Sequence, residues 1–245
     1  MTTEIHTFGT EADGYGEQIH KSENEGDRNF MAFDCPPPAT PYAPPQQRWC
    51  ILEGINFDLD IDVLRDFFLK KEQWVIDNYD HEEITAPQAP QLTQRLRHYN
   101  IFEWEDECPE LTKLRRVIKK FHKEYGKKVW GNTYRYDQKL YIRAWLNVLR
   151  EGEEIGMHIH STHPHSYIAG HFTVTCDDSQ TIYCHPLYQL PDGYRFYCNN
   201  KPGTLTLFPS TVPHCTSVQK TNIPRVTIAF DLTPLTDPGS VLLPL

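Results

Sequence analysis

The chain has 245 residues, of which 39% are hydrophobic and 23% are charged, so it can bury a full core and is expected to form one domain with an appended tail. The 24 basic and 33 acidic residues leave a formal net charge of −9, which disfavours a nucleic-acid partner. No apolar run approaches the roughly 20 residues that cross a bilayer, and the N-terminus lacks a signal-peptide pattern. We therefore expect a cytoplasmic protein (in the host cytoplasm, if the chain is viral) with no membrane partner.

The seven cysteines are odd in number, widely scattered and without a CxxC pair. Neither a disulfide framework nor a zinc knuckle is indicated by this pattern. We expect mostly reduced thiols.

Residues 1–47 are rich in glycine and polar residues and end in the run CPPPATPYAPPQQ. Proline cannot donate the backbone hydrogen bonds of a sheet interior, so this region is expected to be a disordered tail or an arm packed on the domain or a partner. Phe30, Met31 and Phe33 are apolar enough to anchor such an arm. The folded domain is then expected to span residues 48–245.

Two supporting helices are expected within about residues 59–125, after a strand in RWCILEGINF. The first has apolar residues at helical spacing over residues 61–75, with Asp60 as its N-cap. The second has an apolar face over residues 111–125, and Gly126 is expected to end it. Its basic opposite face is interpreted as solvated surface.

Short segments rich in β-branched and aromatic residues follow, separated by turn signals. The expected strands are VWGNTYRY, KLYIRAWLNVL, YIAGHFTVTC, TIYCHPL, YRFYC, GTLTLFP and RVTIAFDL. Many short strands preceded by helices predict a mainly β (α+β) fold, a sandwich or jelly roll over about residues 129–235, with helices on one face.

A histidine cluster, GMHIHSTHPHSYIAGHF, precedes a lone His214 in FPSTVPHCTSV. His158 and His160 are two apart at the expected end of a strand, so both side chains project to one face. In a jelly roll, strands distant in sequence become neighbours, so His214 can join this pair at one metal. Imidazole ligands that leave coordination positions open suit non-haem iron. His165, His171 and His185 are expected to be ordinary core or surface residues.

Arg225 opens the strand RVTIAF, and Thr227 lies two residues further on the same face. If this strand lies next to the one that bears His214, the guanidinium and the hydroxyl face the same cavity. A buried arginine with a hydroxyl partner suits the distal carboxylate of a dicarboxylate. The alternative is a structural ion pair.

Four runs, AWLNVLREGEEIGMHIH, SYIAGHFTV, TIYCHPL and KPGTLTLFPSTVPHCTSVQKTNIPRVTIAFDL, resemble the Fe(II)- and 2-oxoglutarate-dependent oxygenases. They are most similar to a phage and bacterial group with a W-x-N strand, an H-x-H motif, a P-G-x-L-x-x-F-P-S turn and a final H…R-x-S/T. The resemblance covers about residues 140–233. It implies a double-stranded β-helix (a cupin-like jelly roll), Fe(II) and the cosubstrate 2-oxoglutarate.

Carried over by motif position, the resemblance implies that His158 and His214 are metal ligands and that Arg225 binds the 5-carboxylate of 2-oxoglutarate with the help of Thr227. Asn147, in the W-x-N strand, is a weaker candidate for contact with the cosubstrate. No catalytic residue is expected beyond the metal site.

The second metal ligand departs from the wider superfamily, which has a carboxylate where this chain has His160. The insertion SerThrHis that follows leaves His163 and His165 as alternatives, although the motif spacing favours His160. Three neutral ligands would make the iron site one charge more positive than two histidines and a carboxylate.

The expected function is that of an Fe(II)- and 2-oxoglutarate-dependent dioxygenase, which uses O2 to hydroxylate a small-molecule or peptide substrate and releases succinate and CO2. One alternative is a three-histidine, cupin-type dioxygenase without a cosubstrate, and another is a catalytically silent metal-binding structural protein. Neither the substrate nor the oligomeric state is predicted, although Tyr194, Phe196 and Tyr197 are candidates for a pocket wall.

Overall fold

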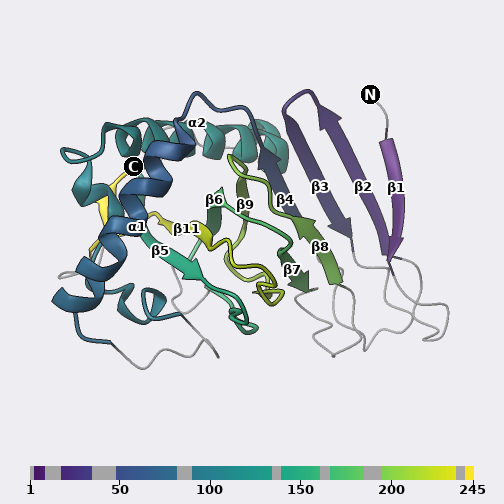
Figure 1. The fold of residues 1–245 in the computed structure, drawn as a ribbon. Helices are drawn as coiled ribbons and strands as arrows, with labels where there is room; N and C mark the ends of the chain where they lie inside the picture. The colour runs from purple at the N-terminus through teal and green to yellow at the C-terminus, as the bar shows by residue number, and fades with distance from the viewer. Residues whose placement is uncertain are drawn as a thin grey trace.

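The computed structural model describes residues 3–8, 18–34, 48–81, 90–133, 139–160, 166–184, 195–235 and 241–245. Within these ranges the chain forms two antiparallel sheets and two long helices (Figure 1). The larger sheet runs in spatial order through β1 (Thr3–Phe8), β2 (Gln18–Glu25), β3 (Arg28–Asp34), β4 (Arg48–Gly54), β9 (Leu205–Pro209), β6 (Ile168–Thr175), β11 (Arg225–Thr233), β5 (Tyr141–Leu149) and β12 (Leu243–Pro244). The smaller sheet runs through β10 (His214–Thr216), β7 (Gln180–Cys184) and β8 (Arg195–Asn199).

A further extended segment joins the smaller sheet, because residues 153–160 run alongside β10. The amide of His158 donates to the carbonyl of His214, and the amide of His214 donates back to the carbonyl of His158, both at 3.0 Å. The amide of Thr216 donates to the carbonyl of Ile155, also at 3.0 Å. Two facing antiparallel sheets confirm the predicted mainly β, jelly-roll fold.

The side chains of β5 and β11 alternate between two environments, because successive residues of a strand point to opposite faces. On one face they join the hydrophobic core with both helices, through Ile142, Ala144, Leu146, Val148, Val226, Ile228, Phe230 and Leu232. On the other face they line a cavity between the sheets, through Arg143, Trp145, Asn147, Arg225, Thr227, Ala229 and Asp231. The larger sheet therefore separates the helical layer from the cavity.

The two helices, α1 (Ile61–Asn78) and α2 (Pro109–Trp130), cover the outer face of the larger sheet (Figure 1). The Asp60 side chain accepts a hydrogen bond from the amide of Val63 at 3.1 Å, which confirms the predicted N-cap. Between α1 and α2 in the sequence lie two short 3-10 helices, η1 (Thr93–Arg95) and η2 (Ile101–Trp104). None of the described helices combines the length and the apolar character needed to span a membrane.

The predicted end of the second helix at Gly126 is wrong, since α2 continues to Trp130. One glycine inside a helix costs only about 1 kcal/mol, and the surrounding helical positions outweigh it. The helix ends instead before Gly131, whose φ of 54° is left-handed. The strand predicted in VWGNTYRY is wrong over its described part, where the chain completes α2 and forms η3 (Gly131–Thr133).

The N-terminal region contributes β1, β2 and β3 to the larger sheet. Phe30, Met31 and Phe33 are buried, and β3 pairs with β4 so that Phe33 lies opposite Trp49 with the two rings stacked. The expected tail or arm is thus an extension of the sheet over these strands. The proline-rich run, residues 35–47, lies outside the described residues, and β4 begins at the predicted boundary, Arg48.

We predict that Gly170→Ala destabilises the fold, because β6 passes too close to its neighbours for a side chain. A Cβ built at Gly170 would lie 2.5 Å from Cζ of Phe230 and 2.6 Å from the backbone oxygen of Thr206. Overpacking of this kind costs about 1–3 kcal/mol, measurable as a lower midpoint in urea unfolding. A variant as stable as the wild type would mean that β6 and β9 separate without cost.

Candidate active site

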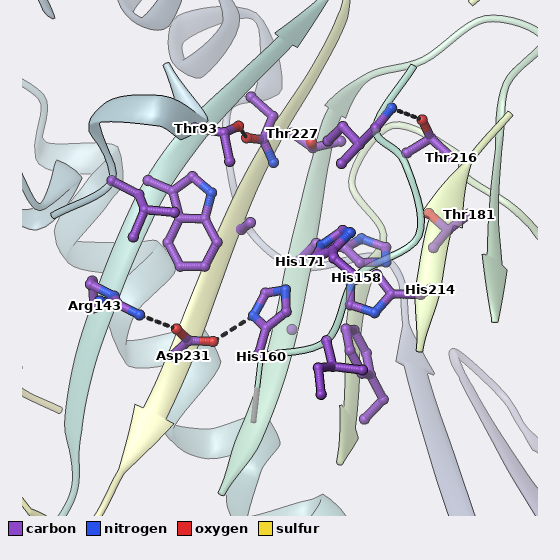
Figure 2. Close-up of a pocket in the computed structure, with 18 of the residues that line it drawn as sticks. Thr93, Arg143, His158, His160, His171, Thr181, His214, Thr216, Thr227 and Asp231 are labelled. Carbon is purple, nitrogen blue, oxygen red and sulfur yellow. Dashed lines mark hydrogen bonds and ion pairs between the residues drawn. The ribbon is translucent and has the colours of Figure 1, made fainter. Parts of the chain in front are cut away.

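A cavity of about 360 Å³ lies between the two sheets, a size typical of small-molecule sites. Its wall on the larger sheet includes the alternate residues of β5 and β11 described above, together with Gly170 and His171 of β6 and Phe208 of β9. Thr181 and Thr216 line it from the smaller sheet. Figure 2 shows these side chains around the three histidines predicted to bind metal.

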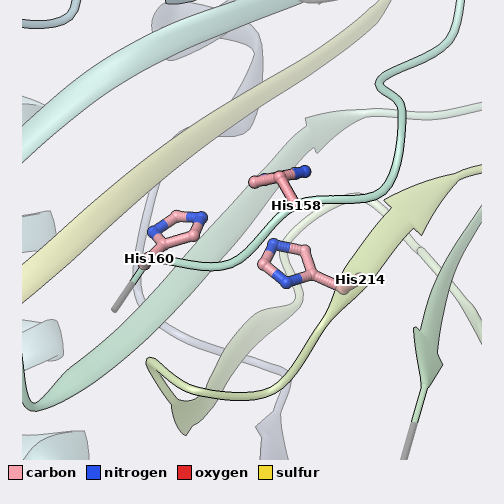
Figure 3. Close-up of side chains that lie close together, drawn as sticks. All are labelled: His158, His160 and His214. Atoms are coloured by element: carbon pink, nitrogen blue, oxygen red, sulfur yellow. The ribbon is translucent and has the colours of Figure 1, made fainter. Parts of the chain in front are cut away.

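The structure brings His158, His160 and His214 together at one side of this cavity (Figure 3). One ring nitrogen of each lies within 4.8 Å of those of the other two. The ring centroids of His158 and His214 are 4.3 Å apart, and that of His160 lies 5.0 Å from His214. The expected strand at the H-x-H motif is wrong, because His158 forms only an isolated bridge with His214.

The hydrogen bonds of the three rings determine which nitrogen is free. Nδ1 of His158 lies 2.8 Å from the carbonyl of Gly156, and Nδ1 of His214 lies 3.0 Å from the carbonyl of Val212. Nδ1 of His160 lies 2.6 Å from a carboxylate oxygen of Asp231. Because these oxygens accept hydrogen bonds, each Nδ1 carries the proton, and each Nε2 keeps a lone pair for a metal.

Burial favours the neutral form of two of the three histidines, His158 and His214. Burial and the neighbouring His160 lower the pKa of His158 to about 4. Burial, with His158 and His160, lowers the pKa of His214 well below its ordinary value. These two imidazoles are therefore neutral at neutral pH, with the proton on Nδ1 and the lone pair of Nε2 free, as a metal ligand requires.

A hydrogen-bonded chain extends from His160 into the wall of the cavity (Figure 2). The second carboxylate oxygen of Asp231 lies 2.7 Å from Nη2 of Arg143. Burial alone would raise the pKa of Asp231, but the adjacent His160 and Arg143 outweigh it and hold the pKa below its ordinary value. Asp231 is therefore an ionised acceptor for the Nδ1 proton of His160.

Arg225 lines the same cavity and is only 3% exposed. Its Nη1 donates to Oγ of Ser179 at 3.3 Å and to the carbonyl of Gln180 at 3.2 Å. Its Nη2 donates to Oγ1 of Thr181 at 2.9 Å, and its Nε is buried without a partner. The guanidinium of β11 thus reaches across to β7 in the other sheet.

No carboxylate of the described residues pairs with Arg225, so the alternative of a structural ion pair is not supported. Burial lowers the pKa of this guanidinium, although an arginine remains charged at neutral pH. The expected adjacency of its strand to the strand of His214 is wrong, because β11 lies between β6 and β5 and β10 belongs to the smaller sheet. Both side chains nevertheless line one cavity.

The remaining predicted residues also line the cavity. Thr227 lies directly opposite Asn147 in the pairing of β11 with β5. The side chain of Asn147 accepts a hydrogen bond from the hydroxyl of Thr93, the first residue of η1. Thr227 makes no side-chain hydrogen bond within the described part of the chain, so its hydroxyl is available to a ligand.

The sequence interpretation missed several polar residues of the cavity, among them Arg143 and Asp231, and it assigned no role to His171. Nε2 of His171 lies 2.8 Å from the hydroxyl of Tyr183, while its Nδ1 is buried without a partner, so this residue is not the satisfied core histidine that was expected. The alternation that pairs Arg225 with Thr227 also leads to Asp231, six residues after Arg225, and this signal was available.

Other predicted candidates do not reach the cavity or cannot be compared with it. His163, His165, His185 and Tyr194 lie outside the described residues. Phe196 packs against Phe33 and Tyr183, and Tyr197 is half exposed. Neither lines the cavity, so the suggested aromatic pocket wall is wrong for these two residues.

A solved structure with a TM-score above 0.5 supports the same type of fold. A prolyl hydroxylase from Trichoplax adhaerens, solved in complex with a hypoxia inducible factor oxygen degradation domain peptide fragment, aligns with a TM-score of 0.54 and 10% identity, over 75% of this chain and 83% of that chain. A Pseudomonas putida prolyl-4-hydroxylase aligns with a TM-score of 0.44 and 12% identity, over 76% and 88% of the two chains. A 2OG-Fe(II) oxygenase family oxidoreductase from Burkholderia pseudomallei gives a TM-score of 0.42 and 12% identity, over 75% and 86%.

A comparison with family models matches residues 143–231 to the family described as "Putative 2OG-Fe(II) oxygenase". No curated protein matches the sequence with significance. The matched segment begins at Arg143 in β5, ends at Asp231 in β11 and contains all six residues predicted to bind metal or cosubstrate. Its family uses Fe(II) and 2-oxoglutarate, as the resemblance of the sequence implied. Residues 143–231 therefore match a 2OG-Fe(II) oxygenase family model, which supports an oxidoreductase.

Proposed function

We propose that this protein is an Fe(II)- and 2-oxoglutarate-dependent dioxygenase that hydroxylates a small-molecule or peptide substrate. One observation carries the proposal. Three histidines with free Nε2 lone pairs and a buried arginine without a carboxylate partner line the same cavity. The free Nε2 lone pairs suit a metal ion, and the buried arginine suits an anionic ligand.

His158, His160 and His214 are the residues that would hold iron. Three imidazoles on one side of a cavity occupy part of an octahedral shell and leave positions for other ligands. When bound there, Fe(II) with 2-oxoglutarate supplies the oxidation of a substrate by O2, with release of succinate and CO2. The chain contributes neutral nitrogen ligands whose orientation is set by the hydrogen bonds at Nδ1.

Arg225 would bind the distal carboxylate of 2-oxoglutarate. A cation that is 3% exposed and bonded only to neutral groups leaves much of its charge uncompensated. A carboxylate beside it would restore charge balance through charge-assisted hydrogen bonds. Thr227 offers a hydroxyl to the same carboxylate, and Asn147, opposite it on β5, is the weaker candidate for a contact with the cosubstrate.

Apolar side chains complete the cavity and limit the access of water. Trp145 and Phe208 pack near His160, with ring centroids 5.5 Å and 6.3 Å away. Leu96 and Ile159 also line the cavity, and Ile159 is 43% exposed, so an apolar surface connects the site with solvent. A substrate with an apolar portion fits this approach.

The cosubstrate-free, three-histidine dioxygenase is a weaker explanation of the same site. Such an enzyme needs the metal ligands but has no use for a buried guanidinium, unless the substrate itself is an acid. Arg225 therefore favours the enzyme that uses 2-oxoglutarate. A catalytically silent metal-binding protein would likewise give no reason for an unpaired buried cation.

We expect that Fe(II) and 2-oxoglutarate, added without oxygen, give the visible charge-transfer band of a chelated 2-oxo acid in the wild type. His158→Ala should abolish the band, because the metal loses one of three nitrogen ligands. His122→Gln is the matched control: His122 is also buried, with a pKa lowered to about 4 by burial, but it lies on α2 outside the cavity. Iron bound without any band in the wild type would contradict the proposal.

Arg225→Lys should weaken the binding of 2-oxoglutarate while it leaves iron binding unchanged. Lysine keeps the charge but loses the fork geometry, and hydrogen bonds to charged groups contribute about 1.5–3 kcal/mol. The 2-oxoglutarate concentration at half-maximal band intensity should rise roughly 10- to 100-fold.

The control for this variant is Arg115→Lys, which changes an arginine that pairs with Glu105 away from the cavity. Because Arg225 also connects the two sheets, thermal unfolding of both variants must be measured without ligand. Equal 2-oxoglutarate affinity in a folded Arg225→Lys variant would remove this residue from the binding site.

A further inference from the structure

The proposed iron ligands include no carboxylate, but a carboxylate lies directly behind one of them. Oδ1 of Asp231 is 2.6 Å from Nδ1 of His160, on the side of the ring away from the free Nε2. Figure 2 shows the continuous chain from His160 through Asp231 to Arg143. Many iron sites carry a negative charge on a ligand. Here the negative charge lies on Asp231, which contacts the proposed ligand His160 instead of the metal.

The carboxylate is itself held in place. Asp231 and Arg143 are directly opposite each other in the pairing of β11 with β5, and Nη2 of Arg143 lies 2.7 Å from the second carboxylate oxygen. The side chains of Asp231 and Arg143 are 17% and 29% exposed. A carboxylate fixed by a strand, an arginine and limited exposure presents a defined acceptor to the imidazole.

His160 depends on this contact more than the other two histidines depend on theirs. His158 and His214 donate to backbone carbonyls of Gly156 and Val212, which no side-chain change can remove. They are also joined to each other by two backbone hydrogen bonds. His160 is tied by its amide to the carbonyl of Ser210 and lies outside any strand, so its ring orientation rests on Asp231 and on packing against Trp145.

We propose that Asp231 is a positioning residue for the metal, which holds the Nδ1 proton of His160 so that Nε2 faces the site as a more basic ligand. This inference rests on the proposed function, since it assumes that the three histidines bind a metal. Arg143 supports it by fixing the carboxylate. Carboxylate partners of metal-bound histidines typically change metal affinity 10- to 100-fold.

The alternative is that the Asp231–Arg143 pair only joins β5 to β11. The chain offers a closely matched pair to separate these roles, because Arg115 and Glu105 lie 2.8 Å apart with side chains 31% and 18% exposed. That pair lies outside the cavity. If the role of Asp231 is structural, Asp231→Asn and Glu105→Gln should have similar effects on stability and none on metal affinity.

The test measures the dissociation constant of Co(II), a spectroscopic substitute for Fe(II), by competition with a chelator in the wild type, Asp231→Asn and Glu105→Gln. We expect affinity to fall roughly 10- to 100-fold in Asp231→Asn, with a changed visible ligand-field spectrum, and to stay unchanged in Glu105→Gln. Thermal unfolding without metal checks that each variant is folded. Equal Co(II) affinity and spectrum in wild type and Asp231→Asn would overturn the inference.

A double-mutant cycle tests whether Asp231 acts through His160. In a His160→Ala background, Asp231→Asn should change Co(II) affinity little, because the ligand that it positions is gone. An undiminished effect in that background would contradict the positioning role. If the wild type itself fails to bind Co(II) or Fe(II), the proposed function fails as well, which separates the two outcomes.

Discussion

The alternation of side chains along β11 is the constraint on which both the core and the site depend. One face of this strand packs with the helices through Val226, Ile228, Phe230 and Leu232. The other face carries Arg225, Thr227, Ala229 and Asp231 into the cavity. A shift of register by one residue would bury the charged set among the helices and expose the apolar set to the cavity. The hydrophobic pattern that folds the sheet therefore also positions the polar groups.

Backbone pairing across the smaller sheet supplies the other half of the site. The reciprocal hydrogen bonds between His158 and His214 bring two distant segments of sequence into contact before any metal binds. Their Nδ1 atoms are then satisfied by carbonyls two residues earlier in each segment. Two of the three candidate ligands are therefore preorganised by local backbone geometry, which reduces the entropy lost when a metal binds.

Much of the fold was predictable because strong local patterns agree with the tertiary structure. The periodicity of the sequence predicts the helix capped by Asp60. It also predicts β5, β6, β7, β8, β9 and β11. Gly126 misled because one unfavourable residue does not end a helix that is stabilised by packing. The strands before residue 35 were missed because their polar and glycine-rich sequence gives little strand signal, and β3 joins the sheet through its pairing with β4.

The candidate site was predictable in its residues but less so in its connections. His158, His160, His214, Arg225, Thr227 and Asn147 all line the cavity. These residues are recognisable because histidine, arginine and asparagine at inward-facing positions of a strand are unusual and occur here at the spacing of a motif. The partner of His160 was not found, because Asp231 follows His160 by 71 residues and meets it only when β11 crosses the cavity wall. A hydrogen bond between residues so far apart in sequence is set by the tertiary structure and leaves no local pattern in the sequence.

Two of the arginines that line the cavity, Arg143 and Arg225, differ in the charge of their partners. Arg143 is neutralised by Asp231, whereas Arg225 is bonded only to neutral oxygens of β7 and the turn before it. An anion entering the cavity therefore gains more from the end at Arg225, where no carboxylate of the described residues competes for the guanidinium. At the other end, the carboxylate of Asp231 favours the protonated Nδ1 of His160 and hence a free Nε2. Under the proposed function, the same strand would thus direct an anion and a metal to different positions in one cavity, and a chelating dicarboxylate would span the two positions.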